Sequence, residues 1–300
     1  MVNLPYKSII SFDTIVSDAA AQCSASPVHN LVLAYDFSPD LVDSQFVKLH
    51  EGKAREWQSN PPPANLFFSH GQYFRGEQGI QYVIKELKTK SSSRRALLSL
   101  GDMDALIESG DRSIPSFMIS QFAIEGDTLY VTEYFRAIEV GSFLPINITE
   151  AALLVKRIIE AVRQPKVVRL LILAFQAHLT PTFHCLEKAT VDMVQGGEIG
   201  VVVAQKNTDK LIEWLEGKKV FESEIATQGL ESIVAAVKAC ENEYSQSVKS
   251  NLEQCMGVLL DIKKMRSASS LESTIENRRN EFVRLVDAAI GELRRMKSGV

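Results

Sequence analysis

The feature that most limits the fold of this chain is a change in the spacing of its apolar residues late in the sequence. Before the change, short apolar runs bounded by turn residues predict strands that alternate with helices. From about Ile212 to the end, proline is absent and apolar residues recur at helical spacing. A chain of 300 residues is long enough for two domains. We therefore expect an α+β fold, with a mixed domain over residues 1–205 and a helical module over residues 206–300.

The helical module carries its periodic apolar residues on two stretches, separated by the serine-containing segment 266–270. This pattern predicts a helical hairpin or a coiled coil. Such helices either pack on a core of their own or use the region 230–297 to bind a protein partner, and the spacing fits both alternatives. The periodic positions are Ile233, Val237, Val248, Leu252, Cys255, Leu259 and Ile262, followed by Ile275, Phe282, Leu285, Ala289, Leu293 and Met296.

Local patterns place the main elements before the module. Apolar runs predict strands, and apolar residues on one face, such as Ile80, Val83 and Leu87, predict helices. The expected strands are 30–37, 95–100, 115–138 with a turn at Gly126, 167–179 and 197–207. The expected helices are 40–57, 79–90 and 149–164, the last with Thr149 as its N-cap.

Composition and charge exclude several classes of protein. The net charge of −4 argues against a protein that covers nucleic acid. The apolar run Val167–Phe175 is shorter than the roughly 20 residues that span a bilayer, and Asp13 and Asp18 interrupt the N-terminal stretch where a signal peptide would be apolar. The four cysteines show no metal-ligand spacing, and we interpret Cys185 as a structural thiol. We expect a cytoplasmic protein without a metal or a membrane partner.

Three motifs occur in order between Phe68 and Leu186. Paired arginines, Arg94 and Arg95, follow a helix; a strand entered through Pro115 continues to Gln121-Phe122; and Arg136 precedes the sequence Leu-Pro-Ile-Asn at 144–147. Together these motifs resemble the thymidylate synthase family. The resemblance implies a homodimer built around packed sheets, which holds a pyrimidine nucleotide monophosphate in a deep cleft.

The resemblance also implies which arginines grip the phosphate. These are Arg94, Arg95 and Arg136, and some of them would reach across the dimer interface. Guanidinium groups suit this role because they form bidentate, charge-assisted hydrogen bonds to phosphate oxygens. Without the resemblance, two adjacent arginines after a serine loop would be interpreted as surface charge.

Three further residues match positions that contact the base or the sugar in that family. Asn147 matches the residue that reads the uracil edge, Gln121 a strand residue near the base, and His178 the residue that meets the sugar. Each also has a structural interpretation: the asparagine as a helix cap, the glutamine as a partner of the backbone, and the histidine as an ordinary structural residue.

Ser116 is the departure that matters most. The family carries its nucleophilic cysteine directly after the proline, and that thiolate adds to C6 of the pyrimidine. A serine hydroxyl is a far weaker nucleophile unless a base deprotonates it. Phe117 occupies the next position, where many members carry histidine. We expect the folate-dependent methylation to be lost.

Other departures support the same expectation. The chain ends in the helical module instead of a tail that closes over folate, so we expect no folate cofactor. Glu51 and Glu56 are candidates, by region alone, for the glutamate that relays protons in the family. The remaining departures are Ala137, Glu139, Phe143, which could fill part of the cleft, and Thr180 in place of a tyrosine that holds the sugar.

Three functions remain open. The chain is a nucleotide-sensing or regulatory scaffold protein, an active enzyme in which Ser116 or a water replaces the thiol, or a structural dimer with a vestigial cleft. The retained arginines and Asn147 favour the first two, and the lost cysteine favours the first over the second.

Overall fold

A computed structural model describes residues 5–101, 107, 114–180, 187–220, 225–240, 243–268 and 272–298. The described chain divides into two compact units. The first unit comprises residues 5–63, 68–101 and 114–180, and the second comprises the short segment 64–67, residue 107 and the described residues from 187 onward. The chain is of the mixed α+β class with helices at its C-terminal end, as the sequence predicts.

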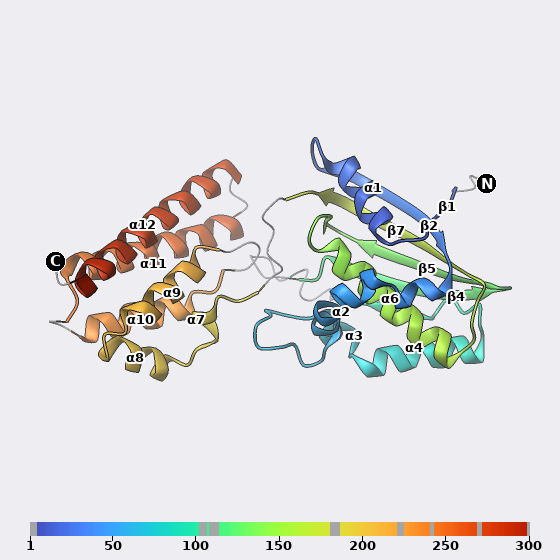
Figure 1. The fold of residues 1–300 in the computed structure, drawn as a ribbon, viewed down its shortest axis with the longest axis horizontal. Helices are drawn as coiled ribbons and strands as arrows, with labels where there is room; N and C mark the ends of the chain where they lie inside the picture. Colours follow the sequence, from blue (N-terminus) through green and yellow to red (C-terminus); the bar gives the residue numbers. More distant parts are fainter. Residues whose placement is uncertain are drawn as a thin grey trace. The chain divides into compact units, whose positions relative to one another are not determined.

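The first unit is built on one mixed seven-stranded sheet with the order β1-β2-β7-β5-β4-β3, while β6 pairs with β7 (Figure 1). Antiparallel pairs join β2 to β7, β3 to β4 and β4 to β5, whereas β5 and β6 run parallel to β7 and β1 runs parallel to β2. The strands are β1 Lys7–Ser8, β2 Val28–Phe37, β3 Leu97–Ser99, β4 Phe117–Glu125, β5 Thr128–Phe135, β6 Ile138–Glu139 and β7 Val167–His178.

Helices of the first unit pack on one face of this sheet. In Figure 1, α1, α2 and α6 lie in front of the strands. Phe12, at the start of α1, contacts Phe37 of β2 and Phe46 of α2 edge to face. The helical elements are α1 Asp13–Cys23, the 3-10 helix η1 Pro39–Asp43, α2 Gln45–Gln58, α3 His70–Phe74, α4 Glu77–Thr89 and α6 Leu144–Ala161.

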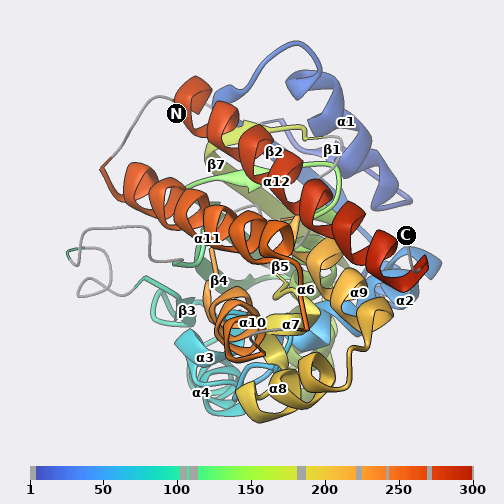
Figure 2. The ribbon, with the colours of Figure 1, turned by 90° about the vertical axis from the view of Figure 1, so that its left-hand side faces the viewer.

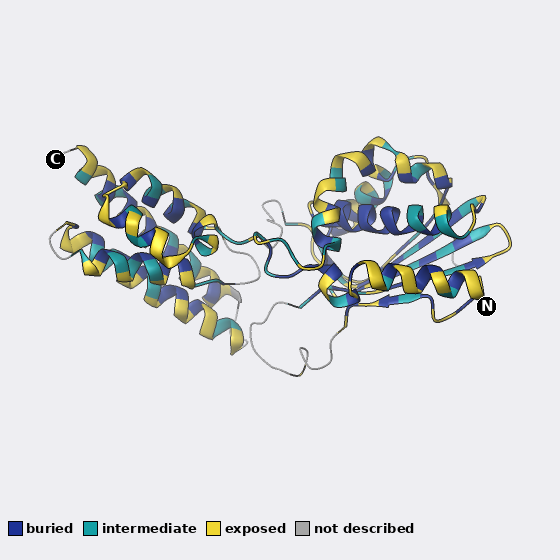
Figure 3. Ribbon diagram, turned by 90° about the horizontal axis from the view of Figure 1, so that it is seen from below, coloured by how far each residue is buried: buried dark blue, intermediate teal, exposed yellow. Residues whose placement is uncertain are grey.

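The opposite face of the sheet is partly exposed in the first unit. Along β2, β5 and β7 buried residues alternate with intermediate or exposed ones, which Figure 3 shows as alternating colours on the strands. The strand register aligns Val32, Leu173, Tyr134 and Ile119 in one row across β2, β7, β5 and β4. A second row consists of Ala34, Leu171, Thr132 and Gln121. We call this surface the bare face.

The second unit is helical and has its own core. Its helices α11 and α12 run side by side (Figures 1 and 2). All the periodic positions predicted from the sequence are buried in this core, except Met296, which is partly buried. The helices are α7 Thr190–Met193, α8 Gly196–Ala204, α9 Thr208–Lys218, α10 Gln228–Ala239, α11 Gln246–Ser267 and α12 Glu272–Ser298.

The predicted strand 197–207 is wrong, because this stretch forms helix α8. Its β-branched residues suggested a strand, yet the buried residues are Ile199 and Val203, one helical turn apart. The helical unit therefore begins before residue 206, where the sequence pattern had placed the boundary.

The predicted N-cap Thr149 is also wrong. Helix α6 begins at Leu144, and Thr149 lies inside it, where its hydroxyl donates to the Pro145 carbonyl at 2.9 Å. The expected helix 40–57 is interrupted at Ser44, which separates η1 from α2. Among the helices that the structure describes, none has the length and apolar character needed to cross a membrane.

Candidate functional site

Arg136 and Ser116 lie together where strands β4 and β5 meet their connecting segments. The Arg136 amide donates to the Ser116 carbonyl at 2.8 Å. The Arg136 guanidinium donates to the carbonyls of Ile114 at 3.2 Å and Pro115 at 3.4 Å. The structure thus brings together the predicted phosphate ligand and the residue at the nucleophile position.

Ser116 has no base to activate it within the described chain. None of the described residues forms a hydrogen bond with its hydroxyl. The His70 ring contacts the neighbouring Phe117 ring, with centroids 5.4 Å apart, but its Nδ1 is engaged by Glu150. A serine hydroxyl without a general base stays a weak nucleophile.

Arg94 and Arg95 are exposed, and their backbone is held firmly. Tyr82 donates its hydroxyl to the Arg95 carbonyl at 3.0 Å, and the Arg95 amide donates to the Ser93 hydroxyl at 3.2 Å. The Gln121 side chain donates to the Arg94 carbonyl at 2.8 Å. Gln121 therefore anchors the arginine segment from the bare face. Neither guanidinium has a partner among the residues that the structure describes.

The two groups of arginines do not converge within one chain. Strand β3, which follows Arg94 and Arg95, pairs with β4 at Gln121, whereas Arg136 lies beside Ser116 at the start of β4. The separation of five residues from Ser116 to Gln121 corresponds to about 17 Å along the strand, and β3 and β5, which flank β4, are roughly 10 Å apart. The two groups of arginines are therefore separated both along β4 and across the sheet. Arg136 is also turned back onto the carbonyls of residues 114 and 115.

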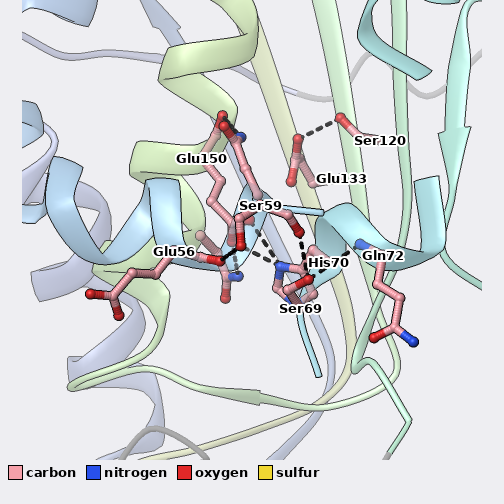
Figure 4. Close-up of polar contacts among 10 residues, drawn as sticks. Glu56, Ser59, Ser69, His70, Gln72, Ser120, Glu133 and Glu150 are labelled. Atoms are coloured by element: carbon pink, nitrogen blue, oxygen red, sulfur yellow. Dashed lines mark hydrogen bonds and ion pairs between the residues drawn. The ribbon is translucent and has the colours of Figure 1, made fainter. Parts of the chain in front are cut away.

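A buried polar cluster lies between α3 and α6 (Figure 4). His70 Nδ1 is 2.9 Å from Glu150 Oε1, and each side chain is 1% exposed. The Asn147 amide donates to Glu150 Oε2 at 3.1 Å. Ser69 caps α3 by accepting from the Gln72 amide at 3.2 Å, and this cap fixes the position of His70. Asn147 thus already has a partner inside the protein.

Aromatic rings enclose His70. The Trp57 ring lies 4.8 Å from it and the Phe143 ring 6.2 Å, measured between centroids. Phe143 is 8% exposed and also contacts Trp57 edge to face at 5.0 Å. The resemblance implies a deep cleft at Asn147, but the void that Asn147 lines with Glu133 is too small to hold a water molecule.

Glu133 is the second buried carboxyl beside this cluster. It is 1% exposed, and its Oε1 accepts from the Ser120 hydroxyl at 2.8 Å. Burial, together with a smaller contribution from the nearby charge of Glu150, raises the pKa of Glu133 to about 8. Glu133 is therefore largely protonated at neutral pH. Glu133 Oε2 and Asn147 Oδ1 are buried without a hydrogen-bond partner in the described chain, and both residues line the void.

Sequence reasoning missed His70, Glu133 and Glu150. One signal was available: in strand β5, Glu133 follows the inward alternation of Leu129 and Val131, where an apolar residue is expected. No comparable signal marks His70 or Glu150, because their pairing depends on the packing of two helices that are distant in sequence.

Glu139 serves as a backbone cap. Its carboxylate accepts from the amides of Gly141, Ser142 and Phe143 just before α6, at 2.8, 2.6 and 3.1 Å. It also accepts from the Thr180 amide at 3.2 Å. This acidic residue therefore satisfies amides at the start of α6, where negative charge is favourable.

The other predicted residues lie apart from the buried cluster or outside the described chain. His178 lies at the end of β7, paired with β6, and is half-buried. Glu51 and Glu56 bind Arg55 and Lys53 on the same helix, and Figure 4 shows the Glu56 carboxylate pointing away from His70. Cys185 lies outside the described residues.

Comparison of the chain with protein-family models and with curated proteins finds no match. Within the described residues, His, Cys, Asp and Glu side chains form no group of three that could hold a metal ion. The resemblance to the thymidylate synthase family therefore rests on the motifs quoted above.

Proposed function

We propose that this chain is a thymidylate synthase-like protein that binds a pyrimidine nucleotide monophosphate or a related nucleotide as a homodimer, in a sensing or regulatory role. It no longer performs folate-dependent methylation in this proposal. The Ser116 hydroxyl, without a base among the described residues, supports the loss of that chemistry. The exposed guanidiniums of Arg94 and Arg95, which lack partners in the described chain, support the binding of an anion.

The observation that carries the proposal is the bare face. Val32, Ile119 and Tyr134 are 37–44% exposed and lie in one row with Leu173. Contiguous apolar surface of this kind marks an interaction site in soluble proteins. A second copy of the same sheet offers a matching surface, because two sheets pack face to face through such rows and a two-fold axis makes the patch self-complementary.

Dimerisation also explains the positions of the arginines. A two-fold axis through the bare face can set the Arg94 end of one sheet against the Arg136 end of the other. The phosphate of the nucleotide would then receive guanidiniums from both copies. Gln121, which lies on the bare face and holds the Arg94 carbonyl, would position the arginine segment at the interface.

A structural dimer with a vestigial cleft is the second candidate. The aromatic rings around His70 and the hydrogen bond from Asn147 to Glu150 favour it, because they fill the region in which a base would be read. The active-enzyme alternative needs a base at Ser116, and the described residues supply none.

Calorimetry with a panel of pyrimidine monophosphates, combined with sedimentation, separates these functions. We expect a dimer that binds at least one nucleotide. Tyr134→Arg should give a folded monomer that no longer binds it. Arg136→Ala should weaken binding by about 1.5–3 kcal/mol, the scale of a hydrogen bond to a charged group. A folded dimer that binds no member of the panel would support the vestigial cleft.

An equimolar mixture of two variants tests whether the site is shared between copies. Arg94→Ala/Arg95→Ala and Arg136→Ala should each bind weakly alone. Mixed dimers should regain one site in which both sets of arginines are intact. Full loss in the mixed dimers would exclude a shared site.

A further inference from the structure

A surface groove of about 350 Å³ lies between α3, α4 and the edge strand β3 in the first unit. Its lining includes Tyr73, Arg75, Gln78, Tyr82 and Ser99. None of its lining residues belongs to the buried cluster around His70 or to the segment of Ser116 and Arg136. This volume falls in the range of pockets that hold small molecules, which is about 300–1,000 Å³.

The local fold fixes the walls of this groove. Arg75 and Gly76 both have positive φ, 64° and 53°, and this reversal turns the chain from α3 into α4. Gly79 lets α4 approach closely, since a Cβ there would lie 2.1 Å from the Phe74 carbonyl oxygen and 3.2 Å from a Leu98 methyl. The walls of the groove are therefore fixed by the close packing of α4 against α3 and β3.

Arg75 gives the groove its charge. It is exposed, and its guanidinium has no partner in the part of the chain that the structure describes. By contrast, Arg55, Arg157 and Arg169 of the same unit each bind a carboxylate. A guanidinium that lines a groove and binds no carboxylate is available to an anion.

Two tyrosines and two small polar groups complete the lining. Tyr82 is 44% exposed and Tyr73 is half-buried, so both offer ring surface to a flat ligand. The Gln78 amide and the Ser99 hydroxyl can each donate and accept hydrogen bonds. On the sheet side, Ala96 and Leu100 form backbone hydrogen bonds with β4. Because bonded residues alternate along an antiparallel strand, the amide and carbonyl of Ser99 point away from β4.

We infer that this groove is a second ligand site, for a small aromatic anion that combines one ring with a phosphate or carboxylate. The anionic group binds Arg75, and the ring contacts Tyr73 and Tyr82. A cation is disfavoured by the guanidinium. A purely apolar ligand would leave Arg75 desolvated without a partner, which is unfavourable. The inference does not depend on the proposed nucleotide site.

The test measures by calorimetry how tightly the full chain binds phenyl phosphate, which is the probe. Inorganic phosphate and phenol are the controls. Phenyl phosphate should bind at least tenfold more tightly than either control. Arg75→Gln should weaken its binding tenfold or more, whereas Arg55→Gln, an exposed arginine on α2, should leave it unchanged. Tyr82→Ala should weaken binding and Tyr82→Phe should retain most of it.

Arg136→Ala separates this site from the proposed nucleotide site. Binding of phenyl phosphate should not change in that variant, even if nucleotide binding is lost. The inference is overturned if Arg75→Gln binds as well as the unaltered chain, if phenyl phosphate binds no better than inorganic phosphate, or if Arg136→Ala removes its binding.

Discussion

His70 and Glu150 form a hydrogen-bonded pair at 2.9 Å between α3 and α6, and both side chains are almost completely buried. The two residues are 80 positions apart in sequence. Because aromatic rings enclose His70, loss of His70 leaves the buried Glu150 carboxyl with the hydrogen bond from Asn147 but without its histidine partner.

His70→Leu should therefore destabilise the first unit by about 3 kcal/mol or more, the scale expected when one member of a buried pair is removed. Urea unfolding at pH 7 measures this change. Arg55→Ala is the matched control, since its pair with Glu51 is exposed and should contribute less than about 1 kcal/mol. Equal stability of the two variants would contradict a structural role for the pair.

Glu133→Gln should stabilise the protein at neutral and alkaline pH. The pKa of Glu133 is raised in the folded state to about 8 from 4.5, so the folded chain keeps a proton that the unfolded chain releases. The contribution to stability is fully present below pH 4.5 and is lost as the pH rises to about 8. Glutamine can accept from Ser120 and does not ionise, so its advantage should grow with pH to a few kcal/mol, at about 1.4 kcal/mol per pH unit.

Thermal melting between pH 5 and pH 9 checks this expectation. The exposed Glu125→Gln, at the end of the neighbouring strand, is the control and should follow the unaltered chain at every pH. A constant difference in melting temperature between Glu133→Gln and the unaltered chain across that range would show that Glu133 is not protonated in the folded state.

The unaltered chain should not convert dUMP to dTMP with methylene-tetrahydrofolate. The Ser116 hydroxyl lacks a base among the described residues, and no thiolate is available at this position. Release of label from C5 of dUMP, with mass detection of dTMP, provides the assay. Turnover at the rate of an ordinary family member would contradict the proposed loss of catalysis.

The stability of a truncated chain should depend on where the second unit is cut. A chain of residues 1–186 should keep a cooperative melt, because the first unit has its own sheet and core. A chain of residues 1–210 should aggregate, because Val191, Ile199 and Val203 would lose the helices that bury them. Light scattering with thermal melting compares the two. A sharp melt of 1–210 and aggregation of 1–186 would reverse the assignment of α7 and α8.

Local patterns were sufficient for much of the fold. The strands on both sides of Gly126 and the buried positions of α11 and α12 follow directly from apolar periodicity. Helix α8 was misjudged because a run of valines suits a strand, while its burial at Ile199 and Val203 depends on helices much later in the chain.

The candidate site was harder to predict because it depends on contacts between distant segments. Arg136 and Ser116 lie together because both flank the hairpin that turns at Gly126, and the apolar pattern does predict that hairpin. Nothing in the local sequence around Asn147 indicates that His70, 77 positions earlier, helps to close the region through Glu150. The rows on the bare face also became visible only with the strand register.

The hydrogen bond from Gln121 to the Arg94 carbonyl links self-association to nucleotide binding in the proposed dimer. Gln121 belongs to the surface that would pack against the second copy, whereas Arg94 belongs to the segment that would hold the phosphate. Anything that orders that surface also orders the arginine segment. By thermodynamic reciprocity, a nucleotide held by Arg94 must tighten self-association by the same factor by which self-association tightens the nucleotide. Gln121→Ala should reduce this factor, so that the dissociation constant of the dimer responds less to nucleotide concentration; the response that remains comes from the guanidiniums that both copies give to the phosphate.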